Sequence, residues 1–399
     1  MKILNTDWML FNWFDNLTIL VNQIKRMTAS KRFLALDVFR GMTICLMIIV
    51  NTPGNDMTFA PLQHAKWHGF TPTDLVFPSF LFAVGNALSF VMPKWAGMNQ
   101  SEILLKIFKR TGLIFLLGFL MYWFPFVKYD GNHQLMLSPL SNTRILGVLQ
   151  RIALCYGIGS LMIYFLKPRL ALIVSIIFLF LYWGLCIWLG DASDPLSITG
   201  NAGLKLDLWL FGESHLYHGE GFAFDPEGLL STMPAIANVV AGYTVGEYVQ
   251  KKGKDFEGLA KLLLTGALLL FLAYCWNMSF PINKKLWTSS FVLITVGLDC
   301  VILSAIIYLI DFKNKIRFVY FFEVLGKNPL FVYLLSEILV ICLYMIPAGD
   351  NSNLFSWIYM NIFDHAGNYF GSLLFAVSYM LVCWSVGYFL DKRKIYVRV

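Results

Sequence analysis

A histidine and an aspartate in one short polar stretch of this 399-residue chain could form an acid–base pair. They are His64 and Asp74, in the stretch QHAKWHGFTPTDLVFP (63–78). A carboxylate that binds one ring nitrogen of a histidine fixes its tautomer, and the other nitrogen can then act as a general base. Asn51, which precedes the stretch, carries an amide that could donate to a developing oxyanion. The alternative interpretation is ordinary interfacial histidines, with Trp67 as part of an aromatic belt.

The composition indicates that these residues belong to a helical membrane protein. Hydrophobic residues make up 58% of the chain and charged residues 14%, whereas soluble domains average about 45–50% and about 25%. Disorder is excluded because it requires low hydrophobicity, and a membrane β-barrel because it would alternate polar and apolar residues. Cysteines and histidines show no metal-ligand spacing, and Walker A, GxGxxG and HExxH motifs do not occur in their expected contexts. We therefore expect no metal site and no nucleotide-driven transport.

The apolar stretches predict an all-α, polytopic bundle of about ten membrane helices, with eleven as the alternative. A spanning helix needs about 20 mostly apolar residues, and such stretches lie near 34–51, 72–92, 106–126, 143–165, 169–190, 230–249, 258–277, 286–310, 318–346 and 369–390. The ninth is long enough to contain a break, which we expect at residues 326–329 because of Gly326 and Pro329. Residues 1–30 predict an amphipathic segment that lies on the membrane. Residues 31–399 then form a single transmembrane domain.

The basic residues predict the topology. They concentrate in the N-terminal segment, in alternate short loops and in the C-terminal tail. The positive-inside rule makes these segments cytoplasmic, so both termini lie inside, and the net charge of +7 reflects topology rather than nucleic-acid binding. The extracytoplasmic loops then lie near 52–71, 127–142, 191–229, 278–285 and 347–368. Lys284 and Lys285 fall outside and are the local exception.

The residues around Asp74 predict how it is positioned. Thr71 is a favourable N-cap residue and Pro72 suits a first helical turn. Asp74 would then lie beside the positive end of the helix dipole. Because Asn51 is expected to end the preceding span on the same side, Asn51, His64 and Asp74 could converge at one membrane face.

Ionisable residues within the spans are functional hypotheses because they are costly in a bilayer. Asp37 and Arg40 lie three residues apart and could pair, or Arg40 could contribute to an anion site. Arg144 and Arg151 lie two helical turns apart and could hold a phosphate. Structural pairing is the alternative for both arginines, with Asp299 and Glu337 as partners.

A second polar group lies at the outer ends of two later spans. Asp225 and Glu227 precede one of them, and Lys285 and Trp287 begin another. Helix capping would explain the carboxylates. Together with a tryptophan in an outward cleft, they would also suit a sugar amine.

Six stretches in sequence order resemble the heparan-α-glucosaminide N-acetyltransferase family of transmembrane acetyltransferases, and specifically its bacterial members. They are LDVFRGMTICLMIIVN (36–51), HAKWHGFTPTDLVFPSFLFAVGNAL (64–88), RILGVLQRIALCY (144–156), FDPEGLLSTMPAIANVVAGYTVG (224–246), PINKKLWTSSFVLITVGL (281–298) and GKNPLFVYLLSEI (326–338). The resemblance implies that cytosolic acetyl-CoA donates its acetyl group to a glucosamine-type amine on the far side of the membrane. It assigns the active-site histidine to His64 and its partners to Asn51 and Asp74.

The resemblance leaves two mechanisms open, a transient acetyl-histidine and direct transfer in a ternary complex. Arg40, Lys327 and Asn328 are the candidates for the anionic end of CoA, and Asp225, Glu227, Lys285 and Trp287 for the acceptor. The resemblance also implies a homodimer, and the predicted topology favours a bacterial inner membrane. The donor and acceptor arrive from opposite sides, so we expect the His64 loop to fold into an outward cavity.

Two other functions remain open from the sequence. A transporter of amino sugars could use Asp299, Glu337 and Arg151 as a coupling relay. An O-acetyltransferase of cell-envelope glycans could use the same histidine and aspartate on a hydroxyl acceptor.

Overall fold

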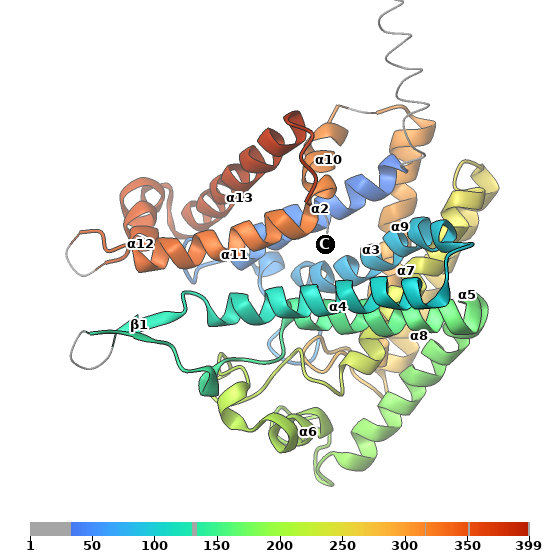
Figure 1. Cartoon of the computed structure of the whole chain (residues 1–399), viewed down its shortest axis with the longest axis horizontal. Helices are drawn as coiled ribbons and strands as arrows, with labels where there is room; N and C mark the ends of the chain where they lie inside the picture. Colours follow the sequence, from blue (N-terminus) through green and yellow to red (C-terminus); the bar gives the residue numbers. More distant parts are fainter. Residues whose placement is uncertain (1–32, 130–133, 316, 350–351, 398–399) are drawn as a thin grey trace, which may run out of the picture.

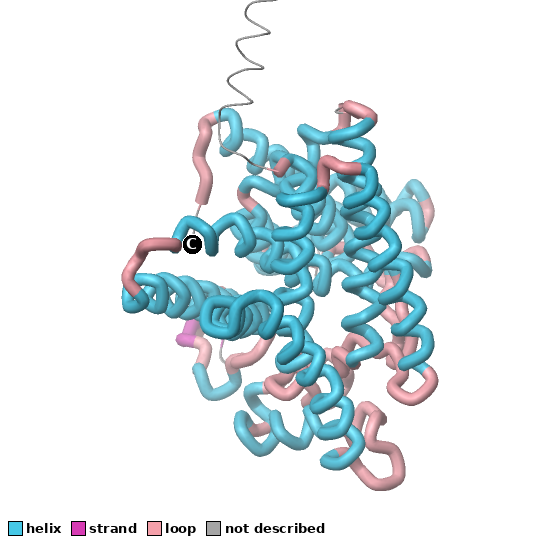
Figure 2. Tube along the Cα trace, turned by 90° about the vertical axis from the view of Figure 1, so that its right-hand side faces the viewer, coloured by secondary structure: helices cyan, strands magenta, loops and turns pink. Residues whose placement is uncertain are grey.

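The computed structural model describes residues 33–129, 134–315, 317–349 and 352–397. The predicted amphipathic segment, residues 1–30, lies outside the described residues. The described chain is mostly helical, and its helices form a bundle with loops gathered at the ends (Figures 1 and 2). The α-helices are α2 (Leu34–Asn51), α3 (Val76–Val91), α4 (Gln100–Trp123), α5 (Val148–Leu189), α6 (Ala202–Phe211), α7 (Thr232–Lys252), α8 (Phe256–Asn277), α9 (Ser289–Ile307), α10 (Val319–Lys327), α11 (Pro329–Met345), α12 (Leu354–Ile358) and α13 (Asn368–Lys392). Strands β1 (Val127–Tyr129) and β2 (Leu135–Leu137) form an antiparallel hairpin.

The expected count of about ten spans is not confirmed. Six helices are long and apolar enough to cross a membrane, and the count is seven when the bent pair α10–α11 is taken as one span. The runs 143–165 and 169–190 lie in α5, which consists of two helices joined at a kink: Lys167, which precedes Pro168, has a non-helical backbone with φ of 63° and ψ of 158°. Both expected helices are therefore present, although α5 counts once among the six. Helices α4 and α7 cover two further expected spans, but charged and polar residues interrupt their apolar runs.

The predicted break in the ninth apolar stretch is confirmed. Helix α10 ends at Lys327, α11 begins at Pro329, and their axes differ by 82°. Proline disfavours the helical conformation for the residue before it. Asn328 accordingly has a non-helical backbone, with φ of −129° and ψ of 49°.

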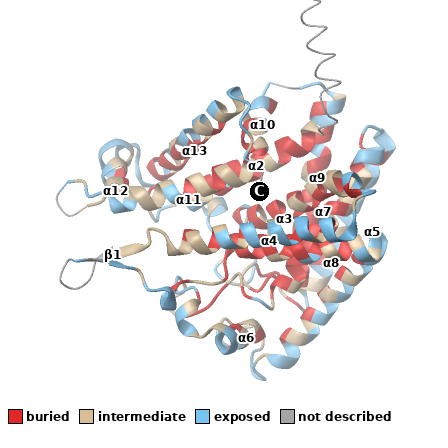
Figure 3. Cartoon of the chain, in the orientation of Figure 1, coloured by how far each residue is buried: buried red, intermediate tan, exposed pale blue. Residues whose placement is uncertain are grey.

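The centre of the bundle is built by helices that approach each other closely at glycines. A Cβ atom on Gly85 of α3 would lie 1.9 Å from the carbonyl oxygen of Val239 on α7. A Cβ atom on Gly41 of α2 would lie 1.8 Å from the carbonyl oxygen of Phe322 on α10. Small residues let membrane helices pack backbone against backbone. Helices α2 and α3, which flank the His64 loop, are therefore held in the buried centre, whereas only 28–33% of the most apolar window of α5, α8 and α13 is buried (Figure 3).

Candidate active site

The structure brings His64 and Asp74 into direct contact. His64 Nδ1 lies 2.7 Å from Asp74 Oδ1. The Asp74 side chain is 1% exposed, whereas that of His64 is 45% exposed. The pair therefore has an imidazole open to solvent and a carboxylate shielded behind it.

Asp74 is fixed by the turn that the sequence predicts. Thr71 is the N-cap of a 3₁₀ turn, Pro72–Leu75, that leads into α3, and it forms a capping box with Asp74. The backbone amides of Thr71 and Ala65 donate to Asp74 Oδ2, at 3.0 and 3.2 Å. Asp74 Oδ1 remains for His64. Because an ionised carboxylate only accepts hydrogen bonds, Nδ1 of His64 is the donor in this contact, which leaves Nε2 as the ring nitrogen that can serve as a base.

Lys284 is a third member of the site that the sequence did not select. Its Nζ lies 3.1 Å from Nδ1 and 3.2 Å from Nε2 of His64, and 3.9 Å from Asp74 Oδ1. An amine in the ring plane at such similar distances would collide with the carbon between the two nitrogens, so Nζ lies over the ring face. Burial holds the pKa of Lys284 below its usual value, although Asp74 and Glu227 act to raise it. One feature of the sequence could have identified Lys284 as a site residue: it is an exception to the positive-inside rule.

The loop that carries His64 is tied to the loop that carries Lys284. The Gly69 amide donates to the Ile282 carbonyl oxygen at 2.8 Å. Asn283 Nδ2 lies 3.3 Å from His68 Nδ1. These contacts fix the imidazole and the ammonium relative to each other.

Asn51 lies at the end of α2, as expected, and its amide contacts a different carboxylate. Asn51 Nδ2 donates to Glu337 Oε1 at 3.4 Å. Glu337 belongs to α11, so this contact joins α2 to the second half of the bent pair. The role of Asn51 toward a thioester stays a prediction.

The candidates for the donor site are engaged with the protein itself. Arg40 pairs with Asp37, which confirms the expected i,i+3 contact. Lys327 bridges Glu323 and Asp391, at 3.0 and 2.9 Å.

Asn328 binds the C-terminal segment. Its amide nitrogen donates to the Ile395 carbonyl oxygen at 3.0 Å, and its amide oxygen accepts from the Val397 amide at 2.9 Å. Thus Lys327 and Asn328 both hold the tail against the bend between α10 and α11.

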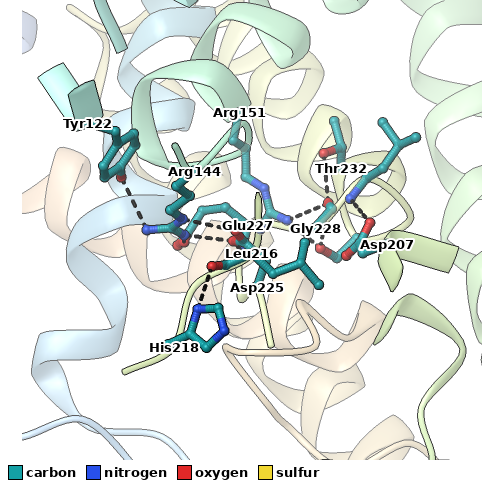
Figure 4. Close-up of polar contacts among 12 residues, drawn as sticks. Tyr122, Arg144, Arg151, Asp207, Leu216, His218, Asp225, Glu227, Gly228 and Thr232 are labelled. Atoms are coloured by element: carbon teal, nitrogen blue, oxygen red, sulfur yellow. Dashed lines mark hydrogen bonds and ion pairs between the residues drawn. The ribbon is translucent and has the colours of Figure 1, made fainter. Parts of the chain in front are cut away.

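The carboxylates of Asp225 and Glu227 belong to a compact ionic group (Figure 4). Arg144 donates to both oxygens of Asp225, at 2.9 and 2.6 Å, and to Glu227 Oε2 at 2.6 Å. The side chain of Asp225 is fully buried and that of Glu227 is 12% exposed. Arg151 donates to the Gly228 carbonyl oxygen at 2.9 Å. The two arginines therefore hold the segment 225–228 from one side.

The remaining acceptor candidates differ in exposure. Lys285 pairs with Glu220 at 2.6 Å at a partly open position. Trp287 is fully buried, donates to Asn238 Oδ1 at 3.1 Å and lies beneath the Arg151 guanidinium. Trp287 therefore packs against the ionic group from its buried side.

Lys284 interacts with both the ionic group and the imidazole. The negative charge of Glu227 favours the protonated form of Lys284, and the positive charge of Lys284 favours the ionised form of Glu227. Lys284 in turn contacts His64. Residues from the loops 63–71, 225–228 and 281–288 therefore form one polar region at the ends of α3, α7 and α9.

Comparison with known proteins shows the family of this chain. The family model of the heparan-alpha-glucosaminide N-acetyltransferase catalytic region matches residues 32–272. The heparan-alpha-glucosaminide N-acetyltransferase of Homo sapiens is 27% identical over 374 residues, which cover 77% of this chain and 53% of the human protein. That of Mus musculus is 26% identical over 430 residues, covering 94% of this chain and 61% of the mouse protein. The chain thus spans little more than half the length of these relatives. The family match covers more than half of this chain, and the chain belongs to the heparan-alpha-glucosaminide N-acetyltransferase family.

Proposed function

We propose that this chain is an integral membrane N-acetyltransferase that transfers the acetyl group of acetyl-CoA to the amine of a glucosamine-type sugar. Acetyl-CoA binds from the cytoplasmic side and the sugar from the extracytoplasmic side, with both chain termini cytoplasmic. The observation that carries the proposal is the contact of an exposed His64 with a buried Asp74 inside the region matched by the family model.

In the direct route, His64 removes the proton that the amine loses. The amine nitrogen attacks the carbonyl carbon of the thioester, and Nε2 of His64 accepts the proton. The C–S bond breaks and CoA leaves as a thiolate, which takes a proton from the imidazolium. Asp74 stabilises the imidazolium, and a general base of this kind contributes typically 10²–10⁴-fold.

Two cationic or polar side chains are suited to the developing oxyanion. The Lys284 ammonium lies beside the imidazole, where a negative charge on the former carbonyl oxygen would be within reach. Asn51 is the second donor that we propose for this oxygen. Removal of either group should lower kcat more than it raises KM.

The same free Nε2 would serve an acetyl-histidine route, in which it attacks the thioester before the amine arrives. The two routes differ in whether acetyl transfer to the protein precedes acceptor binding. Mixing the protein with radiolabelled acetyl-CoA and no acceptor, then quenching within milliseconds, would separate them. A label on His64 supports the two-step route, and CoA release only after acceptor addition supports the direct one.

For the substrates, we propose Arg40, Lys327 and Asn328 toward the anionic end of CoA. Arg40 is the first of these, because its buried Nε lacks a partner among the described residues. On the acceptor side, Glu227 and Lys285 are partly exposed and suit an amino sugar. Asp225 and Trp287 are buried and would position them. We also propose that the protein is a homodimer in a bacterial inner membrane.

The deciding experiment measures acetyl transfer by purified protein with acetyl-CoA and glucosamine. We expect His64→Ala to abolish turnover, and His365→Ala, which removes an exposed imidazole from another loop, to retain it. Wild-type turnover by His64→Ala would overturn the assignment. In sealed vesicles, acetyl-CoA and amine should be required on opposite sides; flux of unmodified sugar without acetyl-CoA would indicate a transporter instead.

A further inference from the structure

A large apolar groove lies between membrane-spanning helices on the side of α5 and α8. Its volume is about 670 Å³, within the range of about 300–1,000 Å³ that is typical of ligand sites. Leu179 of α5 and Leu272 of α8 line its walls, and Ala241 of α7 and Val296 of α9 line its floor. Helices α5, α8 and α9 are all long and apolar enough to cross a membrane. The groove therefore lies at the depth of the bilayer.

The lining offers almost nothing to a polar ligand. Its three hydroxyl groups belong to Ser175, Thr244 and Thr265. Each donates to a backbone carbonyl of its own helix, at 2.8, 3.0 and 2.8 Å. Such internally satisfied hydroxyls add little polarity. The groove is therefore suited to a hydrocarbon chain and not to a sugar or a nucleotide.

The groove is open to the lipid side. Ile176 and Phe180 on one wall and Leu272 on the other are exposed large side chains at its rim. A hydrocarbon chain can therefore enter the groove sideways from the bilayer.

One end of the groove carries two unsatisfied hydrogen-bond donors. The indole nitrogens of Trp183 and Trp276 are buried and have no acceptor among the described residues. The two indole rings lie edge to face, with centroids 5.7 Å apart. Tryptophan at a membrane interface typically keeps its ring in apolar surroundings and donates its N–H to a polar group. This end is therefore suited to the headgroup of an amphipathic molecule.

The same end leads directly to the candidate active site. Helix α8 ends at Asn277, one residue after Trp276, and Asn277 Oδ1 accepts from the Ile282 amide at 2.8 Å. The carbonyl oxygen of Ile282 accepts from Gly69 of the His64 loop. Two residues later, Lys284 contacts His64. A headgroup held at Trp276 is thus separated from the imidazole only by this short loop.

We propose that the groove binds the hydrocarbon chain of a lipid-linked amino sugar, which is the acceptor of acetyl transfer. This inference rests on the proposed function and gives its acceptor a chemical class. The chain lies between α5 and α8, the linking group lies at the two indoles, and the sugar amine reaches His64 from the outer face. Because bilayer lipid is as apolar as the groove, selectivity comes from fit and orientation rather than from the hydrophobic effect.

The test compares methyl glucosaminide with hexadecyl glucosaminide in proteoliposomes. We expect the wild-type KM for the hexadecyl compound to be about tenfold lower, because the bound chain raises the local concentration of the sugar. Ala241→Phe fills the groove floor and should remove this difference while acetylation of the methyl compound stays unchanged. The matched control is Ala267→Phe on an exposed position of α8 outside the groove lining, which should keep the difference. An equal chain-length dependence in wild type and Ala241→Phe would overturn the proposal.

A second measurement does not depend on turnover. A hexadecyl glucosaminide with a diazirine in its chain should label α7 and α9 residues of the groove in the wild-type protein. Labelling that avoids both helices would overturn the proposal even if acetylation is normal. Labelling of the groove without acetylation of either glycoside would retain the lipid site and reject the proposed function.

Discussion

The Lys284 ammonium lies over the face of the His64 imidazole, with Nζ 3.1 Å from Nδ1 and 3.2 Å from Nε2. The two residues are 220 positions apart, and their loops are joined by the contact between Gly69 and Ile282. The contact places a positive charge directly beside the nitrogen that would accept the proton of the amine, where the charge can also interact with a negative oxygen of the substrate.

Lys284→Met should lower kcat by about 10²–10³-fold with little change in KM, because the ammonium beside the imidazole is the cation that we propose for the developing oxyanion. Lys284→Arg keeps the positive charge and should lose less activity. Steady-state kinetics with acetyl-CoA and glucosamine measures kcat and KM separately; an unchanged kcat in Lys284→Met would contradict the proposed role of Lys284.

Asp74→Asn should lower kcat by about 10²–10⁴-fold with little change in KM for acetyl-CoA. The amide keeps the size of the side chain but can donate to Nδ1, which places the ring proton on Nε2 and blocks the base. Steady-state kinetics measures kcat and KM separately. As a structural check, Thr71→Ala removes one hydrogen bond to Asp74 and should cost much less activity. Equal losses in the two variants would indicate that Asp74 acts only in folding the turn.

The local features of the site could be predicted from the sequence, because neighbouring residues determine them. The capping box of Thr71 with Asp74 and the break before Pro329 both depend on the chemistry of a few adjacent residues. The contact of Arg40 with Asp37 follows from helical spacing alone.

Features that depend on distant packing could not be predicted. Lys284 meets His64 only because two loops pack together. Trp287 suits a sugar by its type, but its surroundings bury it against Arg151 and Asn238. Hydropathy also does not give the angle at which the two halves of α5 meet at Lys167, because packing against neighbouring helices determines it.

Asp207 should make the stability of the protein depend on pH. Burial raises the pKa of this side chain on α6 from 3.8 to about 7, although it accepts a hydrogen bond from the Leu229 amide. A carboxyl whose pKa is raised on folding contributes stability that is full below the unfolded pKa and is lost as pH rises through the folded pKa. The melting temperature in detergent should therefore fall as pH rises from about 4 to about 7 and level off above that. Asp207→Asn keeps an acceptor for Leu229 but does not titrate, so its melting temperature should fall less; parallel curves would contradict this assignment.

Arg40→Ala should raise KM for acetyl-CoA by about tenfold, which corresponds to the loss of one charge-assisted contact. Its guanidinium pairs with Asp37 and keeps a buried Nε without a partner among the described residues, so it can still donate to a phosphate. The control acetyl donor is S-acetyl-N-acetylcysteamine, a thioester that lacks the nucleotide of CoA and its phosphates. The variant and the wild type should use this donor equally well, because the reacting atoms at His64 are unchanged. If Arg40→Ala impairs both donors to the same extent, the arginine supports the fold of α2 through Asp37 and does not contact the anionic end of CoA.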